Sequence, residues 1–267
     1  MKRVILATIL SVLVVGAYVW IIVTYSDTGH KNPAVSTPTS AEPATPADSI
    51  PDVSAILPAS TEAATPKPLT DITHGTIEEG HVDLTLDLIY QYPELPSGCE
   101  VVSLTMVLNY YGYNLDKTYL AENYLVYSDN FMAGYTGSPW VDGGCLAPAI
   151  TMTANNFLAD NGRKYTAVNT SGADVRELFD YLDEGVPVLV WCTLELAPRQ
   201  YGYSATYQGE EYIWDYFEHC VVLSGYDLAA NTLTIYDPIY GITTYDIDRF
   251  AEIFDDFYRQ SVILVLN

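Results

Sequence analysis

The first 25 residues hold one long apolar run. It extends from Val4 to Tyr25 without a charged side chain, and Lys2 and Arg3 stand directly before it. As an α-helix the 22-residue run would be about 33 Å long, which is enough to cross the hydrocarbon core of a bilayer. Basic residues at its start favour a cytoplasmic N-terminus. The pattern predicts a single-pass signal-anchor over residues 1–25, with the rest of the chain extracytoplasmic.

A cleaved signal peptide is the alternative interpretation. Such peptides have an apolar region of about 7–15 residues that ends in a small-x-small cleavage site. The nearest match, Val15-Gly16-Ala17, lies inside the apolar run, and the bulky residues that follow it offer no such pair. We therefore favour an anchor retained in the cell membrane, and secretion after cleavage is the alternative.

Residues 26–70 have a different composition. Pro, Ala, Ser and Thr dominate this stretch, which holds 8 of the 15 prolines and no aromatic residue. Such a segment cannot bury enough apolar surface to fold. It predicts a disordered linker that holds the following domain away from the membrane.

Residues 71–267 show the periodicities of a folded domain, with helical spacing first and strand-like runs later. This order predicts an α+β fold in which N-terminal helices pack on an antiparallel sheet. The expected helices are Cys99–Tyr111, a short one capped by Asp116 and ending at Leu125, Leu146–Leu158, and Ser171–Asp183, which Gly185 stops. The expected extended segments are His81–Tyr90, Val186–Leu194, Cys220–Tyr226, Leu233–Tyr236, Ile242–Tyr245 and Ser261–Leu266.

Charge and cysteine content exclude several classes of protein. The chain carries 34 acidic and 11 basic residues, a formal net charge of −23, whereas sequence-independent nucleic-acid binding needs clustered Lys and Arg. The four cysteines form no CxxC pair, which argues against a zinc knuckle or a thioredoxin-like site. One disulfide among Cys145, Cys192 and Cys220 stays open.

The candidate chemistry is a cysteine with a histidine, because GxSxG, GxxxxGK[ST], HExxH and GxGxxG are all absent. Cys99 follows a Pro/Gly turn at the start of a predicted helix, where unpaired N–H groups stabilise a thiolate. Gln91, eight residues upstream, can donate its side-chain amide to an oxyanion, together with the Cys99 N–H.

His219 and Asp237 complete the candidate set. His219 opens a predicted strand, and Asp237 ends the next one, so an antiparallel hairpin would place the carboxylate beside the imidazole and fix its tautomer. Each residue alone has an ordinary structural explanation, namely a small buried cysteine, a structural histidine and an Asp-Pro turn. Their joint order favours catalysis.

The sequence resembles the "C-thirty-nine-like" group of papain-fold cysteine peptidases, which are related to bacterial bacteriocin double-glycine leader peptidases. The resemblance covers nearly all of residues 84–265 and rests on five motifs in the family order. These are Gln91-x-Pro93-Glu94-Leu95-Pro96-x-Gly98-Cys99-Glu100, Gly137-Ser138-Pro139 with Gly144-Cys145-x-Ala147-Pro148, Gly185-Val186-Pro187-Val188-x-Val190-Trp191, Glu218-His219-Cys220-Val221-Val222-Leu223-x-Gly225-Tyr226-Asp227, and Asp237-Pro238-x-x-Gly241.

The resemblance implies a papain-like fold with Cys99 as nucleophile, His219 as general base and acid, Asp237 as the orienting residue and Gln91 in the oxyanion hole. Trp191 and Trp140 are candidate cleft-lining residues, to which the resemblance assigns no role. The double-glycine substrate does not carry over, because leader peptidases form the N-terminus of an ATP-driven exporter and act in the cytoplasm, whereas this chain has no ATPase segment and is expected to face outward.

The sequence therefore predicts a membrane-anchored, extracytoplasmic thiol hydrolase that cleaves a peptide or amide bond of a peptide or protein substrate, near the cell wall. A catalytically inactive module that binds peptide or cell-wall fragments, and a transpeptidase that uses the same acyl-enzyme, are the alternatives. We expect no metal, nucleotide or organic cofactor and no nucleic-acid partner.

Overall fold

The computed structural model describes residues 75–267. The predicted anchor (1–25) and linker (26–70) lie outside the described residues, as does the start of the predicted domain at 71–74. Within residues 75–267, no helix is both long enough and apolar enough to span a bilayer.

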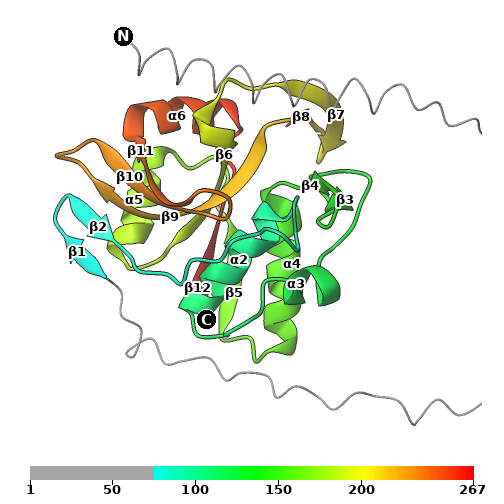
Figure 1. The fold of residues 1–267 in the computed structure, drawn as a ribbon, viewed down its shortest axis with the longest axis horizontal. Coiled ribbons are helices and arrows are strands. Elements are labelled where there is room, and N and C mark those ends of the chain that lie inside the picture. Colours follow the sequence, from blue (N-terminus) through cyan, green and yellow to red (C-terminus); the bar gives the residue numbers. More distant parts are fainter. Residues whose placement is uncertain (1–74) are drawn as a thin grey trace, which may run out of the picture. The chain divides into compact units, whose positions relative to one another are not determined.

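An eight-stranded sheet forms the centre of the described domain (Figure 1). The long strand β9 (Glu218–Asp227) has β10 (Thr232–Asp237) on one edge, whereas β6 (Val188–Thr193) and β2 (His81–Asp83) share its other edge. Every strand pair of this sheet is antiparallel, as the sequence predicts. The remaining strands are β1 (Thr76–Glu78), β11 (Gly241–Asp246), β12 (Ser261–Leu266) and β5 (Tyr165–Asn169).

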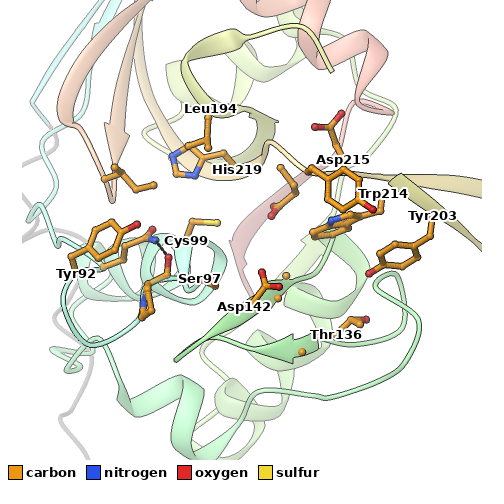
Figure 2. A pocket seen from close by; sticks show the side chains of 18 residues that line it. Tyr92, Ser97, Cys99, Thr136, Asp142, Leu194, Tyr203, Trp214, Asp215 and His219 are labelled. Atoms are coloured by element: carbon orange, nitrogen blue, oxygen red, sulfur yellow. Dashed lines mark hydrogen bonds between the residues drawn. The ribbon is translucent and has the colours of Figure 1, made fainter. Parts of the chain in front are cut away.

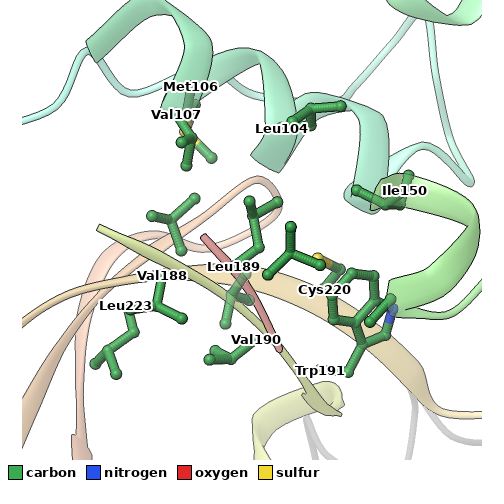
Figure 3. Packing of buried hydrophobic residues seen from close by; sticks show 14 of the residues in the cluster. Leu104, Met106, Val107, Ile150, Val188, Leu189, Val190, Trp191, Cys220 and Leu223 are labelled. Carbon is green, nitrogen blue, oxygen red and sulfur yellow. The ribbon is translucent and has the colours of Figure 1, made fainter. Parts of the chain in front are cut away.

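Helices α2 (Cys99–Tyr110) and α4 (Ala147–Asp160) lie on one side of the sheet, and α5 (Val175–Asp183) and α6 (Ile247–Asp256) lie on the other (Figure 1). Figure 3 shows side chains of α2, such as Leu104 and Val107, packed above β6 and β9. All residues of α2 except Asn109 are buried. Burying an aliphatic side chain such as Leu104 or Val107 contributes about 1.5–3 kcal/mol. These contacts hold α2, and thereby Cys99, against β9.

Two small hairpins stand apart from the main sheet. The strands β3 (Thr136–Ser138) and β4 (Asp142–Gly144) form one hairpin, and β7 (Tyr201–Tyr207) and β8 (Glu210–Asp215) form the other. Arg199 links the second hairpin to the residues after α6, because its guanidinium donates to Ile213 O at 2.9 Å and lies over the rings of Phe257 and Tyr258, 4.7 and 5.1 Å from their centroids.

Several predicted boundaries need correction. The helix expected from Asp116 is only α3 (Tyr119–Asn123), and its N-cap is Thr118, whose side chain makes no capping bond. Helix α5 begins four residues after Ser171, because Asp174 and Glu177 form a capping box there. All four cysteines, which belong to the described part of the chain, are free thiols, so the structure contains none of the disulfides that the sequence left open.

Candidate active site

Cys99 is the first residue of α2, where the sequence predicts it. Its side chain lies beneath β9, because the backbone N–H of Cys220 donates to Cys99 Sγ at 3.5 Å. The glycine before it allows Leu95 to pack closely, as well as leaving the approach to the sulfur open, since a Cβ on Gly98 would lie 2.6 Å from Leu95 Cβ. Cys99 therefore lies next to the strand that carries His219, at the wall of a cavity that both residues line.

Two carboxyl groups surround the thiol. Cys99 Sγ donates to Glu100 Oε2 at 3.4 Å, and the thiol, Glu100 and Glu218 each place one ligand atom within 4.8 Å of the others. Burial raises the pKa of the Cys99 thiol well above its ordinary value, and the nearby carboxylates raise it further. The expected stabilisation of the thiolate by the helix N-terminus is thus outweighed in this conformation by desolvation and by like charge.

The two carboxyl groups are themselves perturbed. Burial raises the pKa of Glu100 to about 7, although the backbone N–H of Cys145 donates to its Oε1 at 2.6 Å. Burial raises the pKa of Glu218 well above its ordinary value, and the charges of Glu100 and Asp215 add to that increase. Both carboxyl groups therefore hold their protons more tightly than exposed glutamates do.

His219 and Asp237 meet as the sequence predicts. His219 Nε2 lies 3.0 Å from Asp237 Oδ1, and both side chains are almost fully buried. The two atoms are close, but their alignment falls short of a regular hydrogen bond, and His219 Nε2 has no other partner. Burial opposes ionisation of Asp237, but His219 and the N–H groups of Ile239 and Tyr240 outweigh it and hold the pKa of Asp237 below its ordinary value.

Gln91 lies on the same cavity as Cys99 and His219. Its backbone N–H donates to Pro238 O at 2.9 Å, so the turn after Asp237 positions it. Its side-chain Nε2 donates to Pro96 O at 2.7 Å, whereas its Oε1 is buried without a partner. One N–H of the amide is thus engaged within the protein, and the second is available to a ligand.

The cavity has a volume of about 350 Å³. Figure 2 shows Cys99 and His219 at one end and Asp142, Tyr203 and Trp214 toward the other. The structure thus brings Gln91, Cys99 and His219 together at this cavity and places Asp237 behind the histidine. The second end, which the two small hairpins form, was not predicted from the sequence.

The two tryptophans chosen from the sequence do not line this cavity. Trp191 is fully buried in the core (Figure 3), where its Nε1 donates to Cys145 O at 2.9 Å. Trp140 is 39% exposed and lies outside the cavity lining. The lining tryptophan is Trp214, and the alternation of aromatic and small residues in Tyr201–Tyr207 was the signal that could have revealed its hairpin.

The described residues contain one group with metal-ligand spacing, formed by Cys99, Glu100 and Glu218. A thiolate with two carboxylates suits a divalent cation such as Zn²⁺, but all three groups must lose their protons first. Burial opposes that loss at each of them. The donor set therefore fits a thiol with neighbouring acids better than a resident metal.

Comparison with known proteins identifies the family. The model of the Peptidase_C39 like family matches residues 84–262. This chain belongs to the C39-like peptidase family. The match spans the described domain from the residue after β2 to the second residue of β12, and it includes all four candidate site residues.

Individual relatives agree with this assignment. The uncharacterized protein YvpB of Bacillus subtilis (strain 168) is 28% identical over 185 residues, which cover 64% of this chain and 70% of that protein. A crystal structure described as a C39-like peptidase from Bacillus anthracis is 26% identical, with a TM-score of 0.62, and the match covers 70% of this chain and 98% of that one. The similarity of that backbone to this one agrees with the mixed helix and sheet architecture.

A double glycine motif protease from an AMS/PCAT transporter, solved with a leader peptide, also matches. It is 18% identical, and the match covers 71% of this chain and 94% of that one. Its TM-score of 0.38 is too low to relate the two sites.

Proposed function

We propose that this chain is a papain-like cysteine peptidase in which Cys99 is the nucleophile, His219 the general base and acid, Asp237 the orienting residue and Gln91 an oxyanion donor. The observation that carries the proposal is the buried pair of His219 on β9 and Asp237 on β10, 3.0 Å apart, because Cys220, the residue after His219, contacts the Cys99 sulfur. A buried histidine held by a carboxylate beside a helix-start cysteine is the arrangement that thiol catalysis needs.

The first step is transfer of the thiol proton. Because His219 Nε2 faces Asp237, its Nδ1 is the atom left to accept the proton of Cys99. In the described conformation the thiol donates to Glu100 instead, so the sulfur must turn from the carboxyl toward the imidazole. A bound substrate that fills the cavity would favour this turn.

The chemistry then proceeds through a thioester. The thiolate attacks the substrate carbonyl carbon, and the oxyanion is bound by the Cys99 backbone N–H and the free N–H of Gln91 Nε2. The imidazolium gives its proton to the leaving amine as the C–N bond breaks. Water then loses a proton to His219 and attacks the thioester, which releases the acid and returns the proton to the thiol.

The experiment that tests this function uses the full chain and a mixture of unmodified peptides, with products identified by mass spectrometry. We expect cleavage by the unmodified protein and none by Cys99→Ala, whereas Cys192→Ala retains cleavage. Added amine distinguishes hydrolysis from transfer by the mass of the product. Equal cleavage by Cys99→Ala and the unmodified protein would contradict the proposal.

One observation favours a non-catalytic alternative. The Cys99 thiol donates to Glu100 Oε2 at 3.4 Å, and burial with the neighbouring carboxylates raises its pKa, as suits a module that binds peptides or cell-wall fragments without cleaving them. If Cys99→Ser binds the same ligand with unchanged affinity, and the unmodified protein never turns it over, the binding function is preferred.

We further propose that residues 1–25 anchor the enzyme in the cell membrane with the domain outside the cytoplasm, and the support is the apolar run behind Lys2 and Arg3. Protease added to intact cells should remove the domain and leave a membrane-bound fragment. Recovery of a shortened chain from the medium would instead indicate secretion after cleavage.

A further inference from the structure

The end of the cavity beyond the thiol is acidic. Asp142, Asp215 and Glu218 are among its lining residues, and the described residues that line the cavity include no Lys or Arg. Asp215 already has partners, because Arg199 Nε lies 3.0 Å from its Oδ2 and the backbone N–H of Phe217 donates to its Oδ1 at 2.8 Å. The carboxyl groups left for a ligand are therefore Asp142 and Glu218.

Glu218 is the more unusual of the two. Its Oε1 is buried and has no hydrogen-bond partner. Its Oε2 lies close to Gly144, where a Cβ would stand 3.0 Å from that atom and 2.5 Å from the Trp214 ring. A Cβ at position 144 would clash with the indole, so the glycine allows the Trp214 ring and the Glu218 carboxyl to lie close to the β4 backbone. Because a buried carboxylate oxygen without a partner is costly, a cation that enters the cavity beside Glu218 would stabilise the ionised carboxylate.

The opposite lining is aromatic. The rings of Tyr203 and Trp214 lie nearly parallel, with centroids 6.3 Å apart and an interplanar angle of 22°. Phe131 packs behind Trp214 at 5.3 Å. Figure 2 shows Asp142 on the β4 side of this space, facing the two rings. Aromatic faces with adjacent carboxylates suit a cation on an aliphatic stem, because the rings attract both the charge and the methylene groups.

We propose that this space is a specificity pocket for a lysine or arginine side chain beside the scissile bond, with Glu218 and Asp142 binding the charge and Trp214 and Tyr203 contacting the stem. The proposal deepens the proposed peptidase function and rests on it. Binding of the cation itself does not require turnover, so it can be measured separately.

The first test compares two thiol reagents that differ in charge. The thiolate of Cys99 displaces methanesulfinate from trimethylammonioethyl or sulfonatoethyl methanethiosulfonate and forms a mixed disulfide. Their rate ratio cancels the thiolate fraction. In the full chain we expect the cationic reagent to label Cys99 at least about tenfold faster, and Glu218→Gln to reduce the ratio severalfold. Glu122→Gln removes an equal charge from an exposed position of α3 and should leave the ratio unchanged.

Equal ratios in Glu218→Gln and Glu122→Gln would overturn the specificity pocket. Circular dichroism confirms that both variants are folded before the rates are compared. If neither reagent labels Cys99, a binding measurement tests the specificity pocket instead.

The second measurement is calorimetric binding of Nα-acetyl-arginine amide and Nα-acetyl-citrulline amide to full-length Cys99→Ala. The two ligands have nearly the same shape, but only the first is charged. We expect the arginine ligand to bind at least about tenfold more tightly, and the preference to disappear when Glu218→Gln is added. Equal affinities would overturn the pocket. A preference for arginine in a protein that cleaves no peptide would refute the peptidase function and leave the pocket standing.

Discussion

Cys99 Sγ donates a hydrogen bond to Glu100 Oε2 at 3.4 Å, so the proposed nucleophile rests against the carboxyl of the next residue in α2. The same carboxyl accepts from the backbone N–H of Cys145 through its other oxygen. Glu100 thus joins the start of α2 to the loop before α4 and at the same time opposes ionisation of the thiol. The described conformation therefore favours the protonated thiol.

Removing the charge of Glu100 should make the thiol more acidic. In Glu100→Gln the bond to Cys145 N–H can be kept, because the amide retains an acceptor oxygen, while the negative charge beside the sulfur is lost. We expect the apparent pKa of Cys99 to fall, and its alkylation by iodoacetamide at pH 7 to become severalfold faster than in Glu122→Gln. An unchanged pH profile of alkylation would contradict the effect assigned to Glu100.

The same substitution should change how stability depends on pH. Burial raises the pKa of Glu100 from 4.5 to about 7 in the folded protein, so the folded state binds this proton more tightly than the unfolded state. The free energy of unfolding therefore falls as pH rises from about 4.5 to about 7, by about 3 kcal/mol, because one pKa unit corresponds to about 1.4 kcal/mol.

Urea unfolding of the full chain at pH 5 and pH 8 measures this loss. Glu100→Gln should reduce this loss and be the more stable protein at pH 8, and the raised pKa of Glu218 accounts for the part of the loss that remains. Glu122→Gln is the control and should follow the unmodified protein. A loss of the same size in Glu100→Gln would show that another group is responsible.

The negative charge of Asp237 should stabilise the His219 imidazolium. In Asp237→Asn the partner of His219 is no longer anionic, so the imidazolium that forms during catalysis loses its stabilisation. We expect kcat/KM to fall by about 10²-fold with little change in KM. The surface pair His81–Asp227, with Nδ1 3.4 Å from Oδ2, provides the matched control, because Asp227→Asn removes the same kind of contact far from the cavity. Equal kinetics in both variants would refute the role of Asp237.

Gln91 should act on the transition state. The free N–H of Nε2 points to a role with the oxyanion, which exists only after attack on the carbonyl. We expect Gln91→Ala to lower kcat by about 10²–10³-fold, with KM nearly unchanged. A rise in KM at constant kcat would instead show that Gln91 binds the ground state. Lys117, which donates to Tyr90 O and Tyr92 O at 2.9 Å, holds the same segment, and Lys117→Met measures how far a shift of that segment mimics the loss of Gln91.

The sequence predicted the elements that carry strong periodicity and defined ends. The helix from Cys99 and the strands around His219 and Asp237 were found because apolar runs end there in Pro, Gly or Asp. A short connection joins β9 to β10, and the antiparallel pairing of these two strands brings Asp237 to His219. The His219–Asp237 pair could therefore be predicted from the sequence.

The acidic surroundings of the thiol could not be predicted. Glu100 was visible as a neighbour of Cys99, but nothing local shows that its side chain turns inward to Cys145 N–H. Glu218 precedes His219 in sequence, yet its contact with Gly144 joins segments 74 residues apart. The β7–β8 hairpin was missed because β7 has no aliphatic residue larger than Ala and only Trp214 and Asp215 of the two strands are buried, so their alternation carries little apolar contrast.

Alkylation of Cys99 in His219→Ala tests the central claim, that Cys99 and His219 act as one nucleophile–base pair, most directly. The rate of iodoacetamide labelling at pH 7, mapped by mass spectrometry in the full chain, is compared with those of the unmodified protein and His81→Ala. The account predicts labelling at least about tenfold slower in His219→Ala and unchanged in His81→Ala. Equal rates in all three proteins would show that the imidazole does not take the thiol proton, and would contradict the account.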